Sequence, residues 1–596
     1  MYYNGLPSTK LIFDWMKRRT FLENTTKGIF ISSAVFSSEY FSGYKKNRAK
    51  LEKRAPLYNG IILPEEWPPR HFRPELEEPM PVPYLQNPPS EIPIDVGRQL
   101  FVDDFLVENT TLARRYHQAK KYEGNPVFRP QSADELGGKD GKRSVVYTGH
   151  GGLFFDWEEG LFKMFYRAGW LGGLALATSK DLIHWQRPEL GLAGGNLLLP
   201  RGPVYTGEQL ATAGSDNSVW LDMEAANPRE RIKYLTCWMH VPADQRPAHT
   251  THTMHVSDGK KWSKAYPTGK FGDYCSFFYN PFRKVWVSSI RVSNGPRGRC
   301  RYYSENADFL EGADWSKAVY WTNTDRFDQP EPAGGYPGAG DAPQLYSLNA
   351  VAYESILVGI HQILRGPQNA VCDAGKFPKL TDLELGYSRD GFHWHRPDRR
   401  GFIAAERTEG TWDRGYNHTI TGIFAVLGDK LVFPYTGFSG IAADGTKGSY
   451  NGASIGLAYL RRDGFASLDA GTTTGTLTTR PITFSGRYLF INASVTRGTL
   501  KTEVQDLSGT PIAPFTLANS LPFKGDSTLA QMLWKGGSDL SKLVGRPVRL
   551  HFELVDGSFY AFWVSQDDSG RSDGYVAAGG PDFPGIKDTV GDKTLR

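Results

Sequence analysis

The sequence has few cysteines, no long apolar run and almost no excess of charge. Its 596 residues include four cysteines and no Cys-x-x-Cys pair, so we expect no zinc or iron–sulfur site and no cofactor. No apolar stretch approaches the roughly 20 residues that a membrane-spanning helix needs. The 69 basic and 64 acidic residues give a net charge of +5, which offers no argument for binding nucleic acid or an anionic membrane. No long amphipathic helix is recognisable.

Two of the cysteines, Cys275 and Cys300, fall within one predicted group of strands, on its first and third strands. A disulfide between them is one interpretation. Buried free thiols are the other, and strands that are not neighbours favour it. The histidines are scattered apart from His249, His252 and His255, whose spacing is a weak metal signal because only even offsets share one face of a strand. We therefore predict no metal site.

The residues that are abundant favour a fold of short strands. Aromatic residues make up 13% of the chain, with 15 Trp, and there are 65 Gly and 38 Pro. This composition is typical of many short strands joined by tight turns. Aromatic side chains also line surfaces that bind sugars.

One phrase recurs along the chain. Its clearest copies are Ala177-Thr-Ser-Lys-Asp-Leu-Ile-His-Trp-Gln-Arg-Pro188 and Gly386-Tyr-Ser-Arg-Asp-Gly-Phe-His-Trp-His-Arg-Pro397. Weaker copies end at Trp262, Trp315 and Leu468, so the phrase recurs every 53 to 79 residues. Repeats of this length, each with several short strands, indicate the blades of a propeller. Because Asp181 and Asp390 recur with the phrase, we assign them to a turn in each blade and not to catalysis.

The pattern predicts an all-β protein: a five-bladed β-propeller over residues 97–469, followed by a β-sandwich over 470–596. The expected first strands of the five blades are 145–155, 216–222, 274–279, 345–353 and 417–427. Beyond Asp469 the strands alternate more regularly, over 488–493, 500–506, 548–554 and 558–564. Residues 97–108 form a further predicted strand, in which the apolar run from Leu100 to Val107 carries Asp103 and Asp104.

Residues 1–40 resemble an export signal. Met16-Lys-Arg-Arg-Thr-Phe-Leu22 has the basic pair of a twin-arginine signal, followed by a moderately apolar stretch, and Met16 is then a candidate start. A basic amphipathic helix is the alternative. Export places the protein in the periplasm or outside the cell. Residues 41–96 are rich in Pro and are predicted to form an extended strap, with Trp67 and Tyr84 as groups to bury.

Acids at the starts of the first strands are candidate catalytic residues. The starts of a propeller's first strands meet at one mouth of its channel, and glycoside hydrolysis needs two carboxyl groups facing across the scissile bond. Asp216 and Asp273 stand at such starts, and Asp103 and Asp104 are further candidates. Glu354 lies in an apolar strand that would raise its pKa as a general acid requires. The alternative is structural: an Asp before a strand is commonly a turn residue, and Glu354 could pair with an Arg such as Arg291.

Other residues are candidates for binding sugar. They lie on the first strands or on loops towards the mouth: His150, Trp170, Arg291, Tyr336, Trp412 and His418. Trp170 or Trp412 could provide an aromatic platform for a pyranose ring. Packing inside the propeller is the alternative for each.

These stretches together resemble the five-bladed propeller glycoside hydrolases of families 32, 43 and 68, and most nearly exported bacterial proteins labelled family-32-like. The resemblance rests on Gly97-Arg-Gln-Leu-Phe-Val-Asp-Asp-Phe-Leu-Val-Glu108, Tyr279-Asn-Pro-Phe-Arg-Lys-Val-Trp286, Val351-Ala-Tyr-Glu-Ser355 and Leu460-Arg-Arg-Asp-Gly-Phe-Ala-Ser467. It implies a secreted enzyme that acts on plant or algal polysaccharides. The Trp-x-Asn-Asp-Pro, Arg-Asp-Pro and Glu-Cys signatures of family 32 are absent, so no catalytic role is carried over.

The predicted function is therefore a glycoside hydrolase with a carbohydrate substrate. A non-catalytic carbohydrate-binding propeller would keep the aromatic residues without converging acids. A glycan phosphorylase on the same fold would need a basic phosphate pocket at the mouth. The sugar, the linkage, the stereochemical outcome and the oligomeric state stay open.

Overall fold

The computed structural model describes residues 55–70, 77–137, 143–201, 213–214, 216–237 and 252–592. The chain divides into two units, Met1–Pro56 with Ile62–Trp67 and Leu57–Ile61 with Pro68–Arg596. Every element named below belongs to the second unit. The predicted export signal (1–40) and parts of the predicted strap (41–54 and 71–76) lie outside the described residues.

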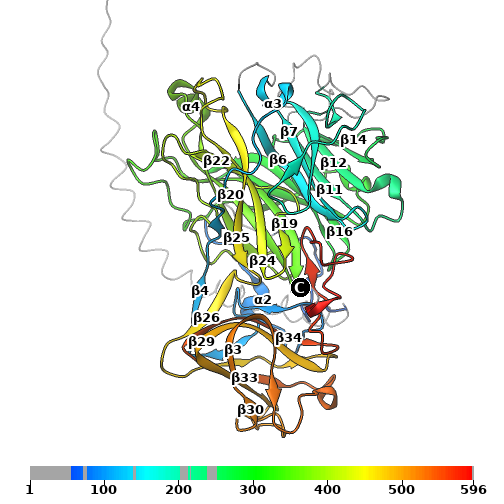
Figure 1. The fold of residues 1–596 in the computed structure, drawn as a ribbon, viewed down its shortest axis with the longest axis vertical. Helices are drawn as coiled ribbons and strands as arrows, with labels where there is room; N and C mark the ends of the chain where they lie inside the picture. The colour runs from blue at the N-terminus through cyan, green and yellow to red at the C-terminus, as the bar shows by residue number, and fades with distance from the viewer. Residues whose placement is uncertain are drawn as a thin grey trace, which may run out of the picture. The chain divides into compact units, whose positions relative to one another are not determined.

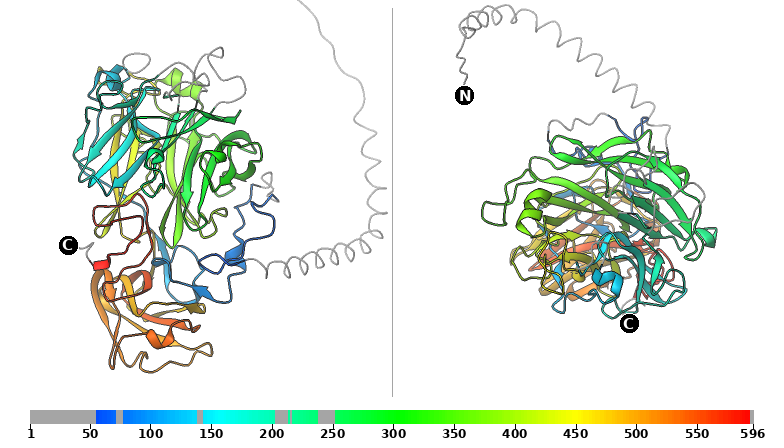
Figure 2. Two further views of the ribbon diagram at one scale, coloured as in Figure 1. Left: turned by 90° about the vertical axis from the view of Figure 1, so that its right-hand side faces the viewer. Right: turned by 90° about the horizontal axis from the view of Figure 1, so that it is seen from above.

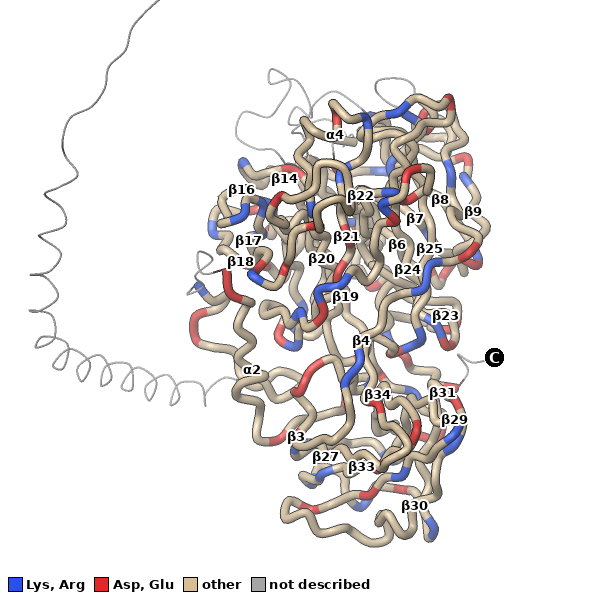
Figure 3. Tube along the Cα trace, turned by 90° about the vertical axis from the view of Figure 1, so that its left-hand side faces the viewer, with Lys and Arg blue, Asp and Glu red and all other residues tan. Residues whose placement is uncertain are grey.

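Strands dominate the described chain, and its helices are short. The helices are α2 (Pro83–Gln86), α3 (Ala133–Gly137) and α4 (Asn369–Gly375), with 3-10 turns η2 (Pro228–Glu230), η4 (Glu311–Ala313) and η5 (Ser541–Leu543). No helix within the described ranges is long and apolar enough to cross a membrane. Basic and acidic residues are interspersed along the Cα trace in Figure 3.

The strands between residues 120 and 461 form four sheets (Figures 1 and 2). The nine-stranded one consists of two antiparallel groups joined by a parallel pair, so we describe the strands as five antiparallel groups. Group one contains β6 (Val146–Asp156), β7 (Leu161–Ala168), β8 (Gly173–Ser179), β9 (Trp185–Gln186) and β10 (Leu197–Leu199). Group two contains β11 (Asp216–Leu221), β12 (Ile232–Cys237), β13 (His252–Ser257) and β14 (Tyr266–Gly269). Group three contains β15 (Ser276–Asn280), β16 (Val285–Gly295), β17 (Gly298–Asn306) and β18 (Val319–Thr322).

Group four contains β19 (Gln344–Glu354), β20 (Ile356–Gly366) and β21 (Leu380–Ser388). Group five contains β22 (Gly415–His418), β23 (Ala425–Leu427), β24 (Lys430–Phe438) and β25 (Ala453–Arg461), with β5 (Lys120–Lys121) added at its edge. The strands predicted from the repeats are confirmed in all five groups, within a few residues at their ends. The fifth predicted first strand is interrupted, because β22 ends at His418 and β23 begins at Ala425.

Neighbouring groups are joined through their first strands. β6 and β11 pair in parallel, with Asn217 opposite His150. Ser276 Oγ of group three donates to the Leu348 carbonyl of group four over 2.9 Å. Thr421 of group five donates its N–H to the His150 carbonyl of group one over 2.8 Å. Strands distant in the sequence therefore meet laterally along one line of contacts.

The groups pack on both faces of their strands, which explains their nearly continuous apolar runs. β20 and β21 are buried at every residue. One core cluster joins groups four and five and contains Val358, Phe402, Phe433 and Phe465. Trp394 of the repeated phrase covers β20 at Gly359, where a Cβ atom would lie 2.6 Å from the indole.

The Asp of the repeated phrase organises a turn, as predicted. Asp181 Oδ1 accepts the backbone N–H groups of Ile183 and His184, and its other oxygen contacts His184 Nδ1 at 2.7 Å. Asp390 makes the same bonds in the second copy, with 2.6 Å to His393 Nδ1. The structural assignment of both carboxylates is confirmed.

A nine-stranded sheet contains most of the C-terminal strands. Its strands are β2 (Gln99–Leu100), β3 (Val107–Thr110), β4 (Ala113–Tyr116), β26 (Ala466–Ala470), β27 (Gly475–Thr479), β29 (Tyr488–Gln505), β31 (Phe523–Gln531), β33 (Arg549–Val555) and β34 (Gly557–Ser565). The two strands predicted over 488–506 are one continuous strand, β29, whose register shifts where β31 pairs with it. A two-stranded pair, β30 (Ser520–Leu521) with β32 (Leu533–Trp534), accompanies the sheet.

Strands from both sides of the predicted boundary at residue 469 share sheets. β3 and β4 lie at the two ends of the nine-stranded order, although both come from the N-terminal segment. β35 (Tyr575–Val576) returns to pair with β19 of group four. The division of the chain into domains stays a prediction.

The segment before residue 97 has only short elements. β1 (Ile92–Pro93) pairs in parallel with β28 (Ile482–Thr483). Tyr84 on α2 is buried, and its hydroxyl donates to the His393 carbonyl over 3.3 Å. The single strand predicted over 97–108 is wrong, because residues 101–106 separate β2 from β3.

Candidate active site

A tyrosine stands at or near the start of the first strand in four of the five groups. These residues are Tyr147, Tyr274, Tyr346 and Tyr416, each at most 8% exposed. Asp216 stands at the start of β11 in the remaining group. Together with His418 we call these residues the mouth cluster.

The mouth cluster completes the lateral contacts between the groups. The Tyr274 N–H donates to Asp216 Oδ2 over 3.2 Å, which joins groups two and three. The Tyr346 and Tyr416 hydroxyls lie 2.7 Å apart and join groups four and five. The Tyr274 hydroxyl also bonds His418 Nδ1. First strands from groups two to five thus contribute to one hydrogen-bonded surface, and Tyr147 of group one packs against His418 with ring centroids 5.9 Å apart.

The backbone is unusual at two residues of the mouth cluster and at His150, whose ring centroid lies 4.0 Å from that of Tyr274. His150, Tyr274 and Tyr416 have φ values of 75°, 61° and 51°, a region that side chains larger than glycine rarely adopt. Gly151 follows His150 with φ 26°, and a Cβ there would lie 2.0 Å from the Phe165 carbonyl oxygen. Strained backbone of this kind clusters at functional sites.

The histidines are neutral at physiological pH. Burial lowers the pKa of His150 to about 3 and holds the pKa of His418 well below its usual value. Several buried polar atoms make no hydrogen bond to the described residues: Tyr147 Oη, His150 Nδ1, His418 Nε2 and the amide atoms of Asn349 and Asn417. Neutral donors and acceptors of this kind suit the hydroxyl groups of a ligand.

Asp273 lies beside Asp216, because it directly precedes Tyr274. Its carboxylate pairs with Arg291 at 2.7 Å, and the Asp273 side chain is 27% exposed. The structure therefore brings together Asp216, Asp273 and Arg291, three residues predicted from the sequence.

Lys379 adds a buried positive charge to the mouth cluster. It is 3% exposed, and its Nζ lies 3.4 Å from Tyr346 Oη. The same Nζ lies 4.6 Å and 5.6 Å from the ring centroids of Tyr416 and Tyr450. Burial lowers its pKa, but the neighbouring Tyr346 and Tyr450 outweigh burial and raise it. No carboxylate of the described residues lies within 4.0 Å of this ammonium group.

Trp170 reaches the cluster but presents no open face. Its ring stacks on Tyr147 with centroids 5.4 Å apart and on Tyr450 with centroids 4.1 Å apart. The indole is the middle layer of a three-ring stack. The prediction that Trp170 is a platform for a pyranose is therefore wrong, and its role is to hold the two tyrosines.

Glu354 is not part of the mouth cluster. It ends β19, eight residues after Tyr346, which places it roughly 26 Å further along the strand. Its carboxylate is fully buried, 3.5 Å from Arg98 Nε and 3.4 Å from Arg462 Nη2. Burial raises the pKa of Glu354. The predicted role as general acid is contradicted, because buried ion pairs surround the group and Asp216 is at the other end of the strands.

Four further predicted site residues contact other parts of the protein and not the mouth cluster: Asp103, Asp104, Tyr336 and Trp412. Asp103 is buried and bonds Arg389 at 2.8 Å, and Asp104 pairs with Arg114 at 2.5 Å on the surface. Neither is placed with Asp216. Tyr336 is buried and donates to the Pro378 carbonyl over 2.6 Å.

Trp412 packs on Tyr435 with ring centroids 5.3 Å apart, within the core of groups four and five. The packing alternative thus holds for Tyr336 and Trp412. His249 lies outside the described residues, whereas His252 and His255 are buried on β13.

The tyrosines and Lys379 were missed by sequence reasoning. The signal was a Tyr at a similar place in four repeats, which an alignment of the first strands would have displayed. A second acidic pair, Asp222 and Glu224, was also missed, and it lies at the opposite end of β11 from Asp216.

No protein-family model matches the chain, and no curated protein matches it. Solved structures that resemble it include glycoside hydrolases. A thermostable family-43 glycoside hydrolase shares 12% identity, with a TM-score of 0.35 over 54% of this chain and 90% of the other. An exo-β-1,3-galactanase from Phanerochaete chrysosporium shares 9% identity, with a TM-score of 0.30 over 76% of this chain and 99% of the other.

A member of glycoside hydrolase family 130, a family of mannoside phosphorylases that contains hydrolases of β-1,2 linkages in Candida mannan, shares 13% identity. Its TM-score is 0.34 over 58% of this chain and 94% of the other.

Proposed function

We propose that the five strand groups are the blades of one β-propeller and that the nine-stranded sheet corresponds to the predicted sandwich. The lateral contacts between successive first strands support this, because they run from group one through group five and back to group one. The start of every first strand then faces the same mouth of the channel.

At that mouth we propose a glycoside hydrolase site for plant or algal glycans, with Asp216 and Asp273 as the paired carboxyl groups. The observation that carries the proposal is the 3.2 Å bond from the Tyr274 N–H to Asp216, which brings the two acids together from different blades. Arg291 stabilises the negative charge of Asp273, which suits a general base that activates water. Asp216, beside the neutral Tyr274, would protonate the leaving oxygen.

The neutral side chains of the mouth would orient the sugar. Tyr147, His150 and His418 offer polar atoms to hydroxyl groups, because these atoms make no hydrogen bond within the described residues. A carbohydrate-binding propeller without activity would use the same groups but would not need the acids.

The test is a screen of the purified protein for reducing-sugar release from plant and algal glycans. Asp216→Asn and Asp273→Asn should each lower turnover at least roughly 100-fold, as expected for loss of a general acid or base. Asp258→Asn, on an exposed turn of the same group as Asp216, is the matched control. Unchanged turnover in both site variants would refute the assignment, and saccharide binding without turnover would favour the non-catalytic propeller.

A glycan phosphorylase is the second candidate, and Lys379 favours it. This buried ammonium group and the Arg299 guanidinium both lie over Tyr346, at 5.1 Å and 5.3 Å from its ring centroid. Such groups could hold a phosphate. A phosphate oxygen would then attack the anomeric carbon while Asp216 protonates the leaving oxygen. The two candidates differ in their product, a free sugar or a sugar phosphate.

We also propose export through the twin-arginine route. The support is the sequence Met16-Lys-Arg-Arg-Thr-Phe-Leu22 alone. A reporter fused after residue 40 should leave the bacterial cytoplasm, and replacing both arginines with lysine should retain it there.

A further inference from the structure

A pocket lies at the far ends of the first strands, away from the mouth cluster. It encloses about 610 Å³ of empty space, including the solvent at its opening. Phe154 comes from β6, Trp220 from β11, Tyr279 from β15 and Val351 from β19, so four strand groups contribute to its walls.

The C-terminal segment forms the remaining wall. The Phe155 N–H donates to the Ala578 carbonyl over 2.7 Å, and the Ala577 N–H donates to the Ala352 carbonyl over 3.1 Å. These bonds fix Tyr575 at the edge of the pocket, opposite Trp157. A pocket with hydrogen-bonded walls does not require a large rearrangement to accept a ligand.

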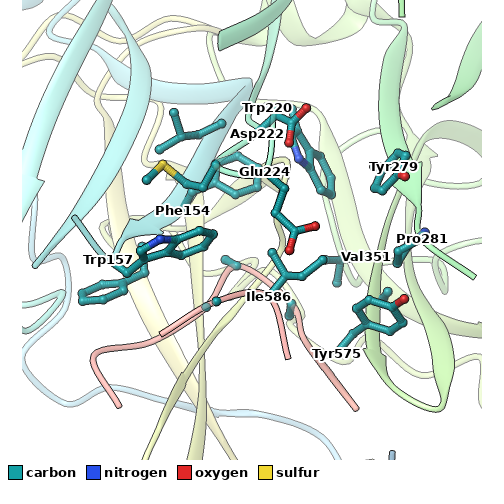
Figure 4. A pocket seen from close by; sticks show the side chains of 18 residues that line it. Phe154, Trp157, Trp220, Asp222, Glu224, Tyr279, Pro281, Val351, Tyr575 and Ile586 are labelled. Carbon is teal, nitrogen blue, oxygen red and sulfur yellow. The ribbon is translucent and has the colours of Figure 1, made fainter. Parts of the chain in front are cut away.

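Two carboxylic acids, Asp222 and Glu224, line this pocket. Figure 4 shows the Glu224 carboxylate between Trp157 on one side and Tyr279 and Tyr575 on the other. Burial raises the pKa of Tyr575 and of Tyr279. The negative charge of Glu224 raises both further, and that of Asp222 adds to the effect at Tyr279, which places the charges near the rings. The carboxylates and the electron-rich aromatic faces all favour a positive ligand.

The basic groups that face the acids only partly balance them. Lys233 Nζ lies 3.8 Å from Asp222 and 4.0 Å from Glu230, so two acids share it. Lys587 Nζ lies over the ring of Tyr575, 5.0 Å from the ring centroid. Arg231 is engaged with Glu158 at 2.6 Å.

The pKa values of Asp222 and Glu224 reflect the same excess of negative charge. Burial, and in Glu224 also the charge of Asp222, raises the pKa of both carboxyl groups despite the nearby lysines. A ligand cation would offset this repulsion and favour the ionised forms.

We infer that this pocket binds a small organic cation, with an ammonium or quaternary ammonium group among Trp157, Trp220, Tyr279 and Tyr575 and with Glu224 and Asp222 as counter-ions. The inference does not depend on the reaction at the mouth. A neutral sugar would meet the same aromatic walls but would leave the paired negative charges uncompensated.

Choline and its neutral isostere 3,3-dimethylbutan-1-ol test the inference, because they differ in charge at nearly constant shape. Calorimetric titration of the full-length protein at pH 7.5 should give at least roughly tenfold tighter binding of choline, the difference that one charge among aromatic rings provides. The affinity for choline should fall as the pH is lowered towards 4.5, as the carboxyl groups become protonated. Methyl glucoside is the neutral sugar to compare.

Glu224→Gln should weaken choline binding about tenfold and leave binding of the isostere unchanged. Its side chain is exposed, so the substitution does not threaten folding. Glu123→Gln, on the surface away from the pocket, is the matched control. Equal affinity for choline and the isostere, preference for methyl glucoside, or full choline affinity in Glu224→Gln would each overturn the inference.

Discussion

Arg462 and Asp588 form an ion pair with 2.7 Å between Nη2 and Oδ2, and both side chains are fully buried. The pair joins the end of strand group five to the C-terminal segment. Arg98, Glu354 and Asp463 complete a network in which three carboxylates surround two guanidinium groups. Four segments distant in the sequence, at Arg98, Glu354, Arg462–Asp463 and Asp588, are thus fixed at one point.

Replacing Arg462 with Met should destabilise the protein strongly. Removal of one partner leaves buried carboxylates without their counter-charge, which costs about 3–5 kcal/mol. Arg487→Met is the matched control, because Arg487 pairs with Asp539 on the surface, where water screens the charges and the loss should be much smaller. Urea unfolding followed by tryptophan fluorescence measures both, and similar losses in the two variants would contradict the role given to the buried network.

The two copies of the repeated turn predict unequal effects for the same substitution. Asp390 is buried and Asp181 is half exposed, although both make the same hydrogen bonds. Asp390→Ala should cost about 1–3 kcal/mol of unfolding free energy, because buried N–H groups lose their acceptor. Asp181→Ala should cost less than about 1 kcal/mol, since water replaces the carboxylate there.

The pH dependence of the Asp390 contribution has a definite sign. Burial raises the pKa of Asp390, but His393 and two backbone N–H groups outweigh it and lower the pKa. A lowered folded pKa stabilises the protein above the unfolded value of about 4, and this contribution is lost as the pH falls. The difference in stability between wild type and Asp390→Ala should therefore shrink below pH 4. A difference that grows with acidity would refute the assignment.

The sequence was most informative where the determining contacts are local. The repeated phrase located its turns because Asp390 bonds residues two and three positions away. The role of Glu354 could not be read in the same way, since its partners Arg98 and Arg462 lie 256 and 108 residues away. Both interpretations of an acid in an apolar strand, catalytic or paired, fitted the sequence, and only the fold distinguishes them.

The same distinction between local and distant contacts explains why only some of the mouth residues could be predicted from the sequence. Asp216 and Asp273 were found because each starts a strand, a property visible in the sequence. Lys379 precedes a third strand and carries no such signal. Its position among tyrosines from groups four and five depends on how the groups pack.

The cysteines should be inert in the folded protein. All four are free and buried, as the strand order favoured, and burial raises the pKa of Cys275 to about 12 and that of Cys300 to about 11. A thiolate is the reactive form, so a disulfide-exchange reagent at pH 8 should label no thiol in the native state and four after denaturation. Rapid labelling of the native protein would contradict the buried positions.

Lys379→Met separates the two candidate reactions at the mouth. If the enzyme is a phosphorylase, inorganic phosphate should accelerate wild-type turnover and a sugar phosphate should appear. Loss of the buried ammonium should then raise the KM for phosphate roughly 30-fold, as expected for one charge-assisted hydrogen bond. Lys379→Arg keeps the charge and should recover part of the effect. Lys447→Met, on the exposed pair with Glu409, is the control and should leave phosphate dependence unchanged. If phosphate does not change the wild-type turnover and the only product is free sugar, the phosphorylase is excluded. Asp216 and Asp273 are then the acids of a hydrolase.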